Sequence, residues 1–111
     1  FAVACWARFR PAGSALPLKA ETLEAMQAPA PASPDYGLGF QLRSAGDLRL
    51  VGHGGANAGW MARLTLAPET GDAIVILTNG TNGTALIEPL EGLWISQLQE
   101  RAKARKVAAP R

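Results

Sequence analysis

The sequence contains very few of the residues that build metal centres and disulfides. It has one cysteine, Cys5, and one histidine, His53, among 111 residues. A lone cysteine forms no internal disulfide, so the cysteine content does not indicate a redox compartment. One cysteine and one histidine also fall short of the three or four ligands that a zinc or iron site requires. The sequence therefore predicts no metal site, and we expect no other cofactor.

Long apolar runs and a strong charge bias are missing as well. No run approaches the roughly 20 residues needed to span a bilayer, so no transmembrane segment is predicted. The net charge is +2, and five of the 11 basic residues crowd the last eleven positions. No aromatic side chains are interleaved with them, as a base-stacking surface would require. We interpret them as the solvated end of a helix, where cations complement the helix dipole, and expect no nucleic-acid partner.

The composition and the order of patterns predict one domain, or part of one. Hydrophobic residues make up 48% of the chain, enough for a modest core. The opening "FAVACWARFRPAG" repeats apolar residues at helical spacing, through Val3, Trp6 and Phe9. It has no initiator methionine, capping residue or signal sequence, which favours a fragment or a processed chain.

The chain divides into four predicted segments. Residues 1–28 are expected to be helical, with a second short helix that ends at Pro29, and residues 29–35 form a proline-rich connector. Residues 36–80 predict a sheet, and residues 81–111 predict a C-terminal helix with a basic tail. The fold class is thus α+β: an antiparallel meander of about three strands with a C-terminal helix packed on it and N-terminal helical segments.

Period-two alternation and short turns define the expected strands. "YGLGFQLR" places Tyr36, Leu38, Phe40 and Leu42 on one face, and a turn over residues 44–47 leads into "LRLVGHGG". "GWMARLTLAP" alternates next, "ETGD" is a tight turn, and "AIVILTN" reads as a strand buried on both faces. These connections are too short for parallel crossovers, so the strands should be antiparallel.

The last segment predicts an amphipathic helix that begins with Pro89 at its first position. Its expected apolar stripe is Leu90, Leu93, Trp94 and Leu98, while Glu91, Gln97, Glu100 and Arg101 lie largely off it. This helix should cover one face of the sheet, and residues 1–28 are too few to cover the whole of the other.

The segment "GHGGANAGW", residues 52–60, places the only histidine among glycines. It matches neither common phosphate-binding pattern and leads into a strand instead of a helix N-terminus. The residues alone leave two interpretations of His53: a structural histidine beside a hairpin, or part of a site. Glycines in a strand mark bulges or close approach, and here they would let a substrate lie along the strand edge.

In order and spacing, "YGLGF" followed by "GHGGANAGWMARLTLAPETGDAIVILTNG" resembles the C-terminal part of the serine β-lactamase-like superfamily. This superfamily includes class C β-lactamases, DD-peptidases (penicillin-binding proteins) and related esterases. The upstream "LPLKAETLEAMQAP" is similar to a segment that precedes the same motifs. The resemblance implies that residues 1–111 are the C-terminal portion of a β-lactamase/transpeptidase-like hydrolase domain. Such enzymes are mostly bacterial and often exported, which favours a periplasmic or secreted location and leaves a cytoplasmic one open.

The resemblance also implies roles for individual residues. His53, Gly54 and Gly55 match the family's Lys-Thr-Gly or His-x-Gly box, in its histidine form. The implied catalytic residues are His53, Gly55 and Ala56, whose backbone N–H would be the second oxyanion-hole donor. Gly54, Asn57 and Trp60 would border the substrate. A histidine in the box favours the esterase, peptidase and amidase branches, with little or no β-lactam turnover.

The family's nucleophile motifs do not occur in this chain. None of Ser14, Ser33, Ser44 and Ser96 has a lysine three residues later, and Tyr36, the only tyrosine, is not in a Tyr-x-Asn or Tyr-x-Ser motif. The chain alone is therefore expected to be inactive, and its parent to act on a small ester, amide or peptide through an acyl-enzyme. The expected partner is the missing N-terminal portion of its own protein, or another copy of the chain. The alternative is a non-catalytic module of the same fold, used for binding or assembly.

Overall fold

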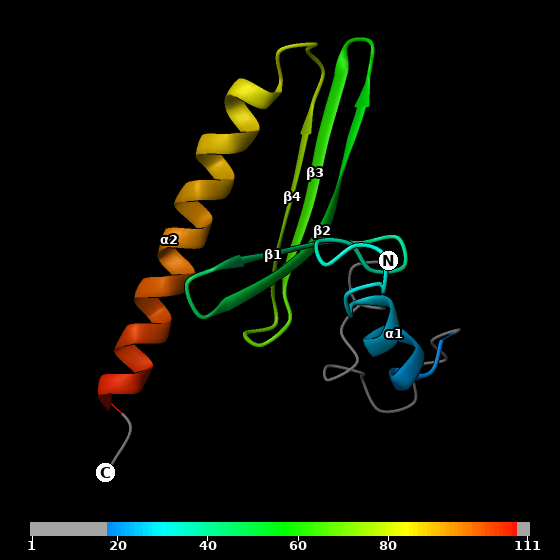
Figure 1. Ribbon diagram of the computed structural model, residues 1–111. Coiled ribbons are helices and arrows are strands. Elements are labelled where there is room, and N and C mark those ends of the chain that lie inside the picture. The colour runs from blue at the N-terminus through cyan, green and yellow to red at the C-terminus, as the bar shows by residue number, and fades with distance from the viewer. Residues whose placement is uncertain (1–17, 109–111) are drawn as a thin grey trace.

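A computed structural model describes residues 18–108 as a four-stranded antiparallel sheet with one long and one short helix (Figure 1). The elements are α1 (Ala20–Met26), β1 (Gln41–Ala45), β2 (Leu48–Asn57), β3 (Trp60–Ala67), β4 (Asp72–Thr78) and α2 (Thr84–Ala108). The strands neighbour one another in chain order, β1-β2-β3-β4. The α+β meander with a C-terminal helix is confirmed, with one strand more than the three expected.

The short N-terminal helix α1 ends before Pro29, as predicted, and buries Leu23. The connector over residues 29–35 turns back on itself instead of running extended, because the N–H of Ser33 donates to the carbonyl of Ala30 at 3.0 Å. The helix predicted around Val3, Trp6 and Phe9 lies outside the described residues.

Three glycine-containing turns set the register of the sheet. Gly46, Gly59 and Gly71 have φ values of 59°, 80° and 75°, in the left-handed region that glycine adopts without steric cost. The turns join Ala45 to Leu48, Asn57 to Trp60 and Ala67 to Asp72, each an opposed pair of neighbouring strands. The local turn chemistry was therefore readable from the sequence.

The prediction that the first strand begins at Tyr36 was wrong, because β1 begins at Gln41. The N–H of Gly37 donates to the carbonyl of Phe40 at 2.8 Å, and Gly39 has a φ of 82°, so the chain turns here. Leu38 is exposed whereas Phe40 is buried, so they do not share the face that alternation suggested. Tyr36 remains close to the sheet through an isolated bridge to Gln41.

Two apolar clusters lie on opposite faces of the sheet. Leu48, Leu50 and Ala67 pack with Leu98 of α2 on one face. Phe40, Val51 and Leu66 form the other cluster, with Met26 of α1 packed against it. Neighbouring residues of β2 and β3 thus serve different cores, as the alternation of side chains along a strand requires.

The strand β4 is an edge strand, and the prediction that it is buried on both faces was wrong. Val75 and Leu77 are 58% and 76% exposed, while Ile76 points to the opposite face and is buried. A continuous apolar run does not distinguish a central strand from an edge strand, because both follow the same local pattern.

The C-terminal helix begins at Thr84, so Pro89 lies inside it and not at its first position. The predicted stripe was also wrong in part. Ile87, Glu91 and Leu98 are the buried positions, whereas Leu93 is 65% exposed. The helix is rotated so that Glu91 faces the sheet, where Arg43 and Thr65 bond its carboxylate. No helix among residues 18–108 has the length and apolar character needed to cross a membrane.

Candidate functional site

The glycine-rich half of β2 has one strand edge without a partner strand. The pairing of β1 with β2 stops at Gln41 opposite Gly52, whereas β2 continues to Asn57 along β3. Between His53 and Asn57, therefore, no described strand pairs with the edge turned away from β3. Alternate residues of such a segment direct their N–H and C=O groups outward, where an incoming extended group can bond them.

His53 is exposed and is held by two neighbours. Its Nε2 lies 2.8 Å from the hydroxyl oxygen of Tyr36, and the two rings meet edge to face with centroids 6.1 Å apart. Its Nδ1 contacts the carbonyl oxygen of Gly54. A carbonyl only accepts, so in the neutral ring Nδ1 carries the proton and Nε2 accepts from the phenol.

This pairing brings in a residue that sequence reasoning left out of the site. Tyr36 was assigned to a strand, 17 residues before the histidine. Two successive pairings, Tyr36 with Gln41 and Gln41 with Gly52, bring it next to His53. The signal lay in the turn glycines between Tyr36 and Gln41, which permit that return. With both nitrogens engaged, His53 is oriented by Tyr36 and does not offer a free base.

Most of the other predicted site residues lie at the tip of the β2–β3 hairpin. Gly55, Ala56, Asn57 and Trp60 line a cleft of about 210 Å³ together with Met61, Ala62, Leu77 and Thr78. His53 and Gly54 are not part of its lining. The structure thus divides the predicted residues between two neighbouring places, the Tyr36–His53 pair and the hairpin-tip cleft.

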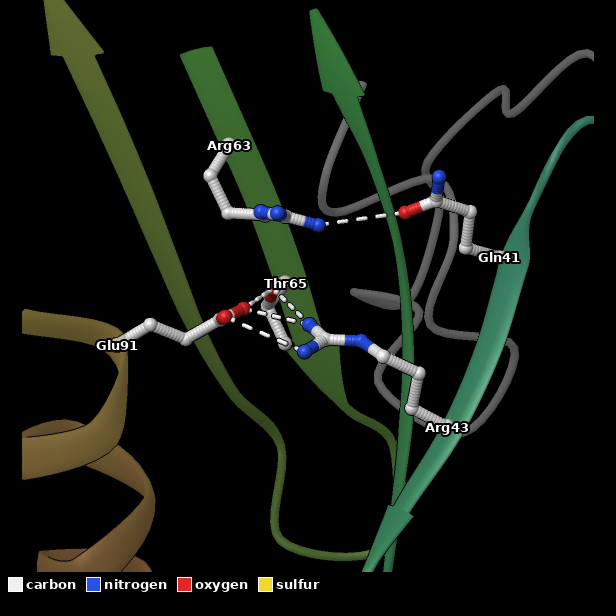
Figure 2. A network of polar contacts seen from close by, with 5 residues as sticks. All are labelled: Gln41, Arg43, Arg63, Thr65 and Glu91. Atoms are coloured by element: carbon white, nitrogen blue, oxygen red, sulfur yellow. Dashed lines mark hydrogen bonds and ion pairs between the residues drawn. The ribbon is translucent and has the colours of Figure 1, made fainter. Parts of the chain in front are cut away.

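The best organised polar cluster lies on the other face of the sheet, under α2 (Figure 2). The guanidinium of Arg43 donates to both carboxylate oxygens of Glu91, at 2.6 and 3.2 Å. The buried hydroxyl of Thr65 also donates to Glu91 and accepts from Arg43 at 3.2 Å. One carboxylate of α2 is therefore bonded to β1 and β3 at once.

Burial raises the pKa of the Glu91 carboxyl, but hydrogen bonds from Arg43 and Thr65 and the charges of Arg43 and Arg63 outweigh it, so the net pKa is lowered. The group is ionised at neutral pH and fully bonded, which makes it a structural anchor and not an acid or base. Sequence reasoning missed it because Glu91 looked like a surface residue. Its spacing from Ile87 and Leu98, four and seven residues, was the available signal.

Arg63 lies beside Gly54 but leaves room for a side chain there. The two residues are opposed in the β2–β3 pair, and a Cβ at Gly54 would lie 3.8 Å from the Arg63 guanidinium. Arg63 donates to the side-chain oxygen of Gln41 at 3.3 Å, while its buried Nε has no hydrogen-bond partner among residues 18–108. This distance is an ordinary van der Waals contact, so packing beside Arg63 does not by itself require a glycine at position 54.

Within the part of the chain that the structure describes, no three His, Cys, Asp or Glu side chains lie close enough to hold a metal ion. Comparisons of the sequence and structure with protein-family models, curated proteins and solved structures give no match. The interpretation as a β-lactamase-like hydrolase therefore depends on the sequence motifs and on the geometry above.

Proposed function

We propose that this chain forms one wall of the active site of a serine hydrolase that acts on esters or amides through an acyl-enzyme. The serine nucleophile would come from residues outside this sequence. The observation that supports the proposal best is the open, glycine-rich edge of β2 between His53 and Asn57, with an oriented histidine at its start.

Each residue has a role that fits its position. The substrate's acyl group would lie along the β2 edge, which Gly54 and Gly55 keep free of side chains. His53 would position the substrate or the catalytic Tyr and Lys of the missing part, and a hydrogen bond from either to Nε2 would replace the present one from Tyr36. Asn57 and Trp60 would border the group that extends toward the hairpin tip.

The backbone N–H of Ala56 would stabilise the negative charge that develops on the carbonyl oxygen. The serine hydroxyl attacks the carbonyl carbon and forms a tetrahedral oxyanion, which expels the alcohol or amine and leaves an ester on the serine. Water then hydrolyses this ester. One preorganised donor to the oxyanion contributes on the order of 3 kcal/mol.

The test compares two proteins, this chain alone and a longer protein that joins it to a Ser-x-x-Lys segment. Only the longer protein should react with a fluorophosphonate probe and hydrolyse p-nitrophenyl esters. In it, His53→Ala should lower kcat/KM by about 100-fold, the order of loss expected when the substrate or a catalytic group is no longer held in place. Lys103→Ala, at an exposed site on α2, is the matched control and should leave kcat/KM unchanged. Unchanged kinetics for His53→Ala would contradict the role assigned to this wall.

A second candidate is a non-catalytic module of the same fold, used for binding or assembly. It is favoured by the four serines, none of which has the lysine that would activate it, and by the exposed apolar edge at β4. If the fluorophosphonate probe labels neither protein, this candidate replaces the hydrolase.

A further inference from the structure

The outer edge of β4 has none of the features that normally protect an edge strand. The sheet ends at β4, and no described strand pairs with its far side. The strand is seven residues long and contains no lysine, no proline and only one charge, Asp72 at its start. That charge is already paired with Arg101 at 2.5 Å. Such an edge is a template for a further strand.

Apolar side chains flank this edge on both faces of the sheet. On the face opposite α2, Val75 and Leu77 are exposed. On the α2 face, Leu86, Leu90 and Leu93 form an exposed stripe along the helix. Leu90 and Arg101 are about three turns apart and share a flank of α2, and Arg101 reaches Asp72 of β4.

The opposite flank of α2 faces the β1–β2 turn, away from β4. There, Gln99 donates to the carbonyl of Ala45 and Lys106 to the carboxylate of Asp47, both at the β1–β2 turn. Leu90 is therefore turned toward the free edge of β4, and Leu86 and Leu93 lie next to it on the solvent side of the helix. An unpaired edge with apolar surface on both sides is a single docking surface, which we call the β4 edge surface (Leu86, Leu90, Leu93, Val75, Leu77 and the β4 backbone).

We propose that the β4 edge surface binds a second copy of this chain, with the two β4 strands antiparallel about a two-fold axis at Val75. Directly opposite residues of an antiparallel pair point to the same face, so a symmetric pair places one residue on the axis. Full overlap of Asp72–Thr78 makes that residue Val75. The two sheets then form one eight-stranded sheet with both α2 helices on the same face.

A second copy complements every part of the surface. In this register Ile74 faces Ile76, and Ala73 faces Leu77, so apolar residues meet on both faces. Asp72 faces Thr78, so no like charges are opposed. The two copies of Leu90 lie on the helix flanks that are turned toward the axis.

The assembly is closed and does not extend into a fibre. Pairing through β4 leaves β1 and the unpaired His53–Asn57 segment of β2 at each outer edge of the joined sheet. The strand β1 is only five residues long, and short edge strands resist further pairing. An isologous contact uses the same surface on both copies, so this contact ends at two copies.

The first test measures the molar mass of the full chain by sedimentation equilibrium. The chain should sediment with twice the mass of one copy. Val75→Lys and Leu77→Lys should each raise the dissociation constant about tenfold or more, because a lysine would be buried at the contact. Val107→Lys, at an 87% exposed apolar position near the end of α2, is the matched control and should leave the mass unchanged. A monomeric chain, or lysine variants that associate like the parent, would overturn the proposal.

The second test fixes the register by disulfide cross-linking in a Cys5→Ser background, which removes the only native thiol. Val75→Cys should cross-link on mild oxidation, because opposed Cα atoms at about 4.5–5.5 Å suit a disulfide. Leu77→Cys should not, although Leu77 is the more exposed residue, since its partner is Ala73 and the two thiols lie several residues apart. Circular dichroism verifies that both variants are folded. Cross-linking through position 77 and not 75 would disprove this register.

Discussion

At the scale of single residues, Glu91 is the side chain that bonds α2 to both β1 and β3. It is buried among apolar neighbours on α2, yet three hydrogen bonds from Arg43 and Thr65 satisfy its carboxylate. A buried charge of this kind is expensive to leave without its partners, so its loss affects the docking of the helix more than any surface ion pair would.

Glu91→Gln should lower the free energy of unfolding by about 2 kcal/mol, because the amide keeps the shape but loses the charge and leaves Arg43 without its anion. Arg43 is partly exposed, which keeps the cost below that of a fully buried pair. Urea unfolding followed by circular dichroism gives the value. Glu88→Gln, at an exposed site one turn earlier on α2, is the control and should change stability by less than about 0.5 kcal/mol.

The same carboxyl predicts a pH dependence of stability. Its folded pKa is lowered, so its contribution is fully present above the ordinary glutamate pKa of about 4.3 and is lost as pH falls through the folded value. The stability difference between the native chain and Glu91→Gln should therefore be constant above about pH 5 and shrink below it. Urea midpoints of both proteins between pH 3 and 7, in about one-unit steps, measure this difference. A difference that grows on acidification would contradict the lowered pKa.

The Tyr36–His53 contact makes a spectroscopic prediction. With Tyr36 donating to Nε2, the neutral ring is held with its proton on Nδ1. Tyr36→Phe removes the donor, so the ring should redistribute toward the Nε2-protonated form and reorient more freely. The 15N shifts of the His53 ring at pH 8 report the two forms directly. Shifts identical in both proteins would show that the phenol does not orient the ring.

At the scale of secondary-structure elements, the sequence predicted the turns better than the ends of strands and helices. Each hairpin contains a glycine with positive φ, a local requirement that is visible in a few letters. The start of β1 depends instead on a turn at Gly37, where a side chain would collide with the carbonyls of Met26 and Ala28. That constraint comes from residues at the C-terminal end of α1, which lie outside the window 36–42. The alternation within that window therefore gave no sign of it.

The rotation of α2 was mispredicted for a similar reason. Apolar periodicity favoured a face containing Leu90 and Leu93, but the sheet presents Arg43 and Thr65 beneath the helix, and these require a carboxylate. The helix therefore buries Glu91 and leaves Leu93 exposed. A polar pair on two other strands decided which side of the helix faces the core, and no window along the helix contains that information.

The glycines of β2 are not equivalent, although they look alike in the sequence. A Cβ at Gly52 would collide with the backbone carbonyl of Leu64 on β3, whereas one at Gly55 would lie 3.7 Å from the Ala62 side chain, an ordinary contact. Gly52→Ala should therefore cost about 3 kcal/mol of stability, and Gly55→Ala less than about 0.5 kcal/mol. Thermal unfolding of the two variants tests the difference. Equal losses would mean that β2 and β3 separate readily at Gly52.

At the scale of the whole molecule, the two apolar clusters lie on opposite faces of the same two strands, β2 and β3. Val51 and Leu50 are neighbours on β2 but belong to clusters on opposite faces, as do Leu66 and Ala67 on β3. Separation of β2 from β3 would therefore expose both clusters to solvent. The Tyr36–His53 pair depends on this arrangement too, since it joins the chain before β1 to the part of β2 beyond it. Motifs indicated the histidine, and only the folded sheet identified its partner.

This coupling predicts a single unfolding transition for residues on both faces. Leu66→Ala and Leu98→Ala remove fully buried side chains from different clusters, and each should cost about 3 kcal/mol. Because β2 and β3 are shared, each variant should shift the far-UV helix signal and the tryptophan fluorescence to the same lower urea concentration. If Leu98→Ala lowered the urea midpoint of the helix signal alone, and the sheet around Leu66 unfolded at a higher urea concentration, the two faces would be separate folding units.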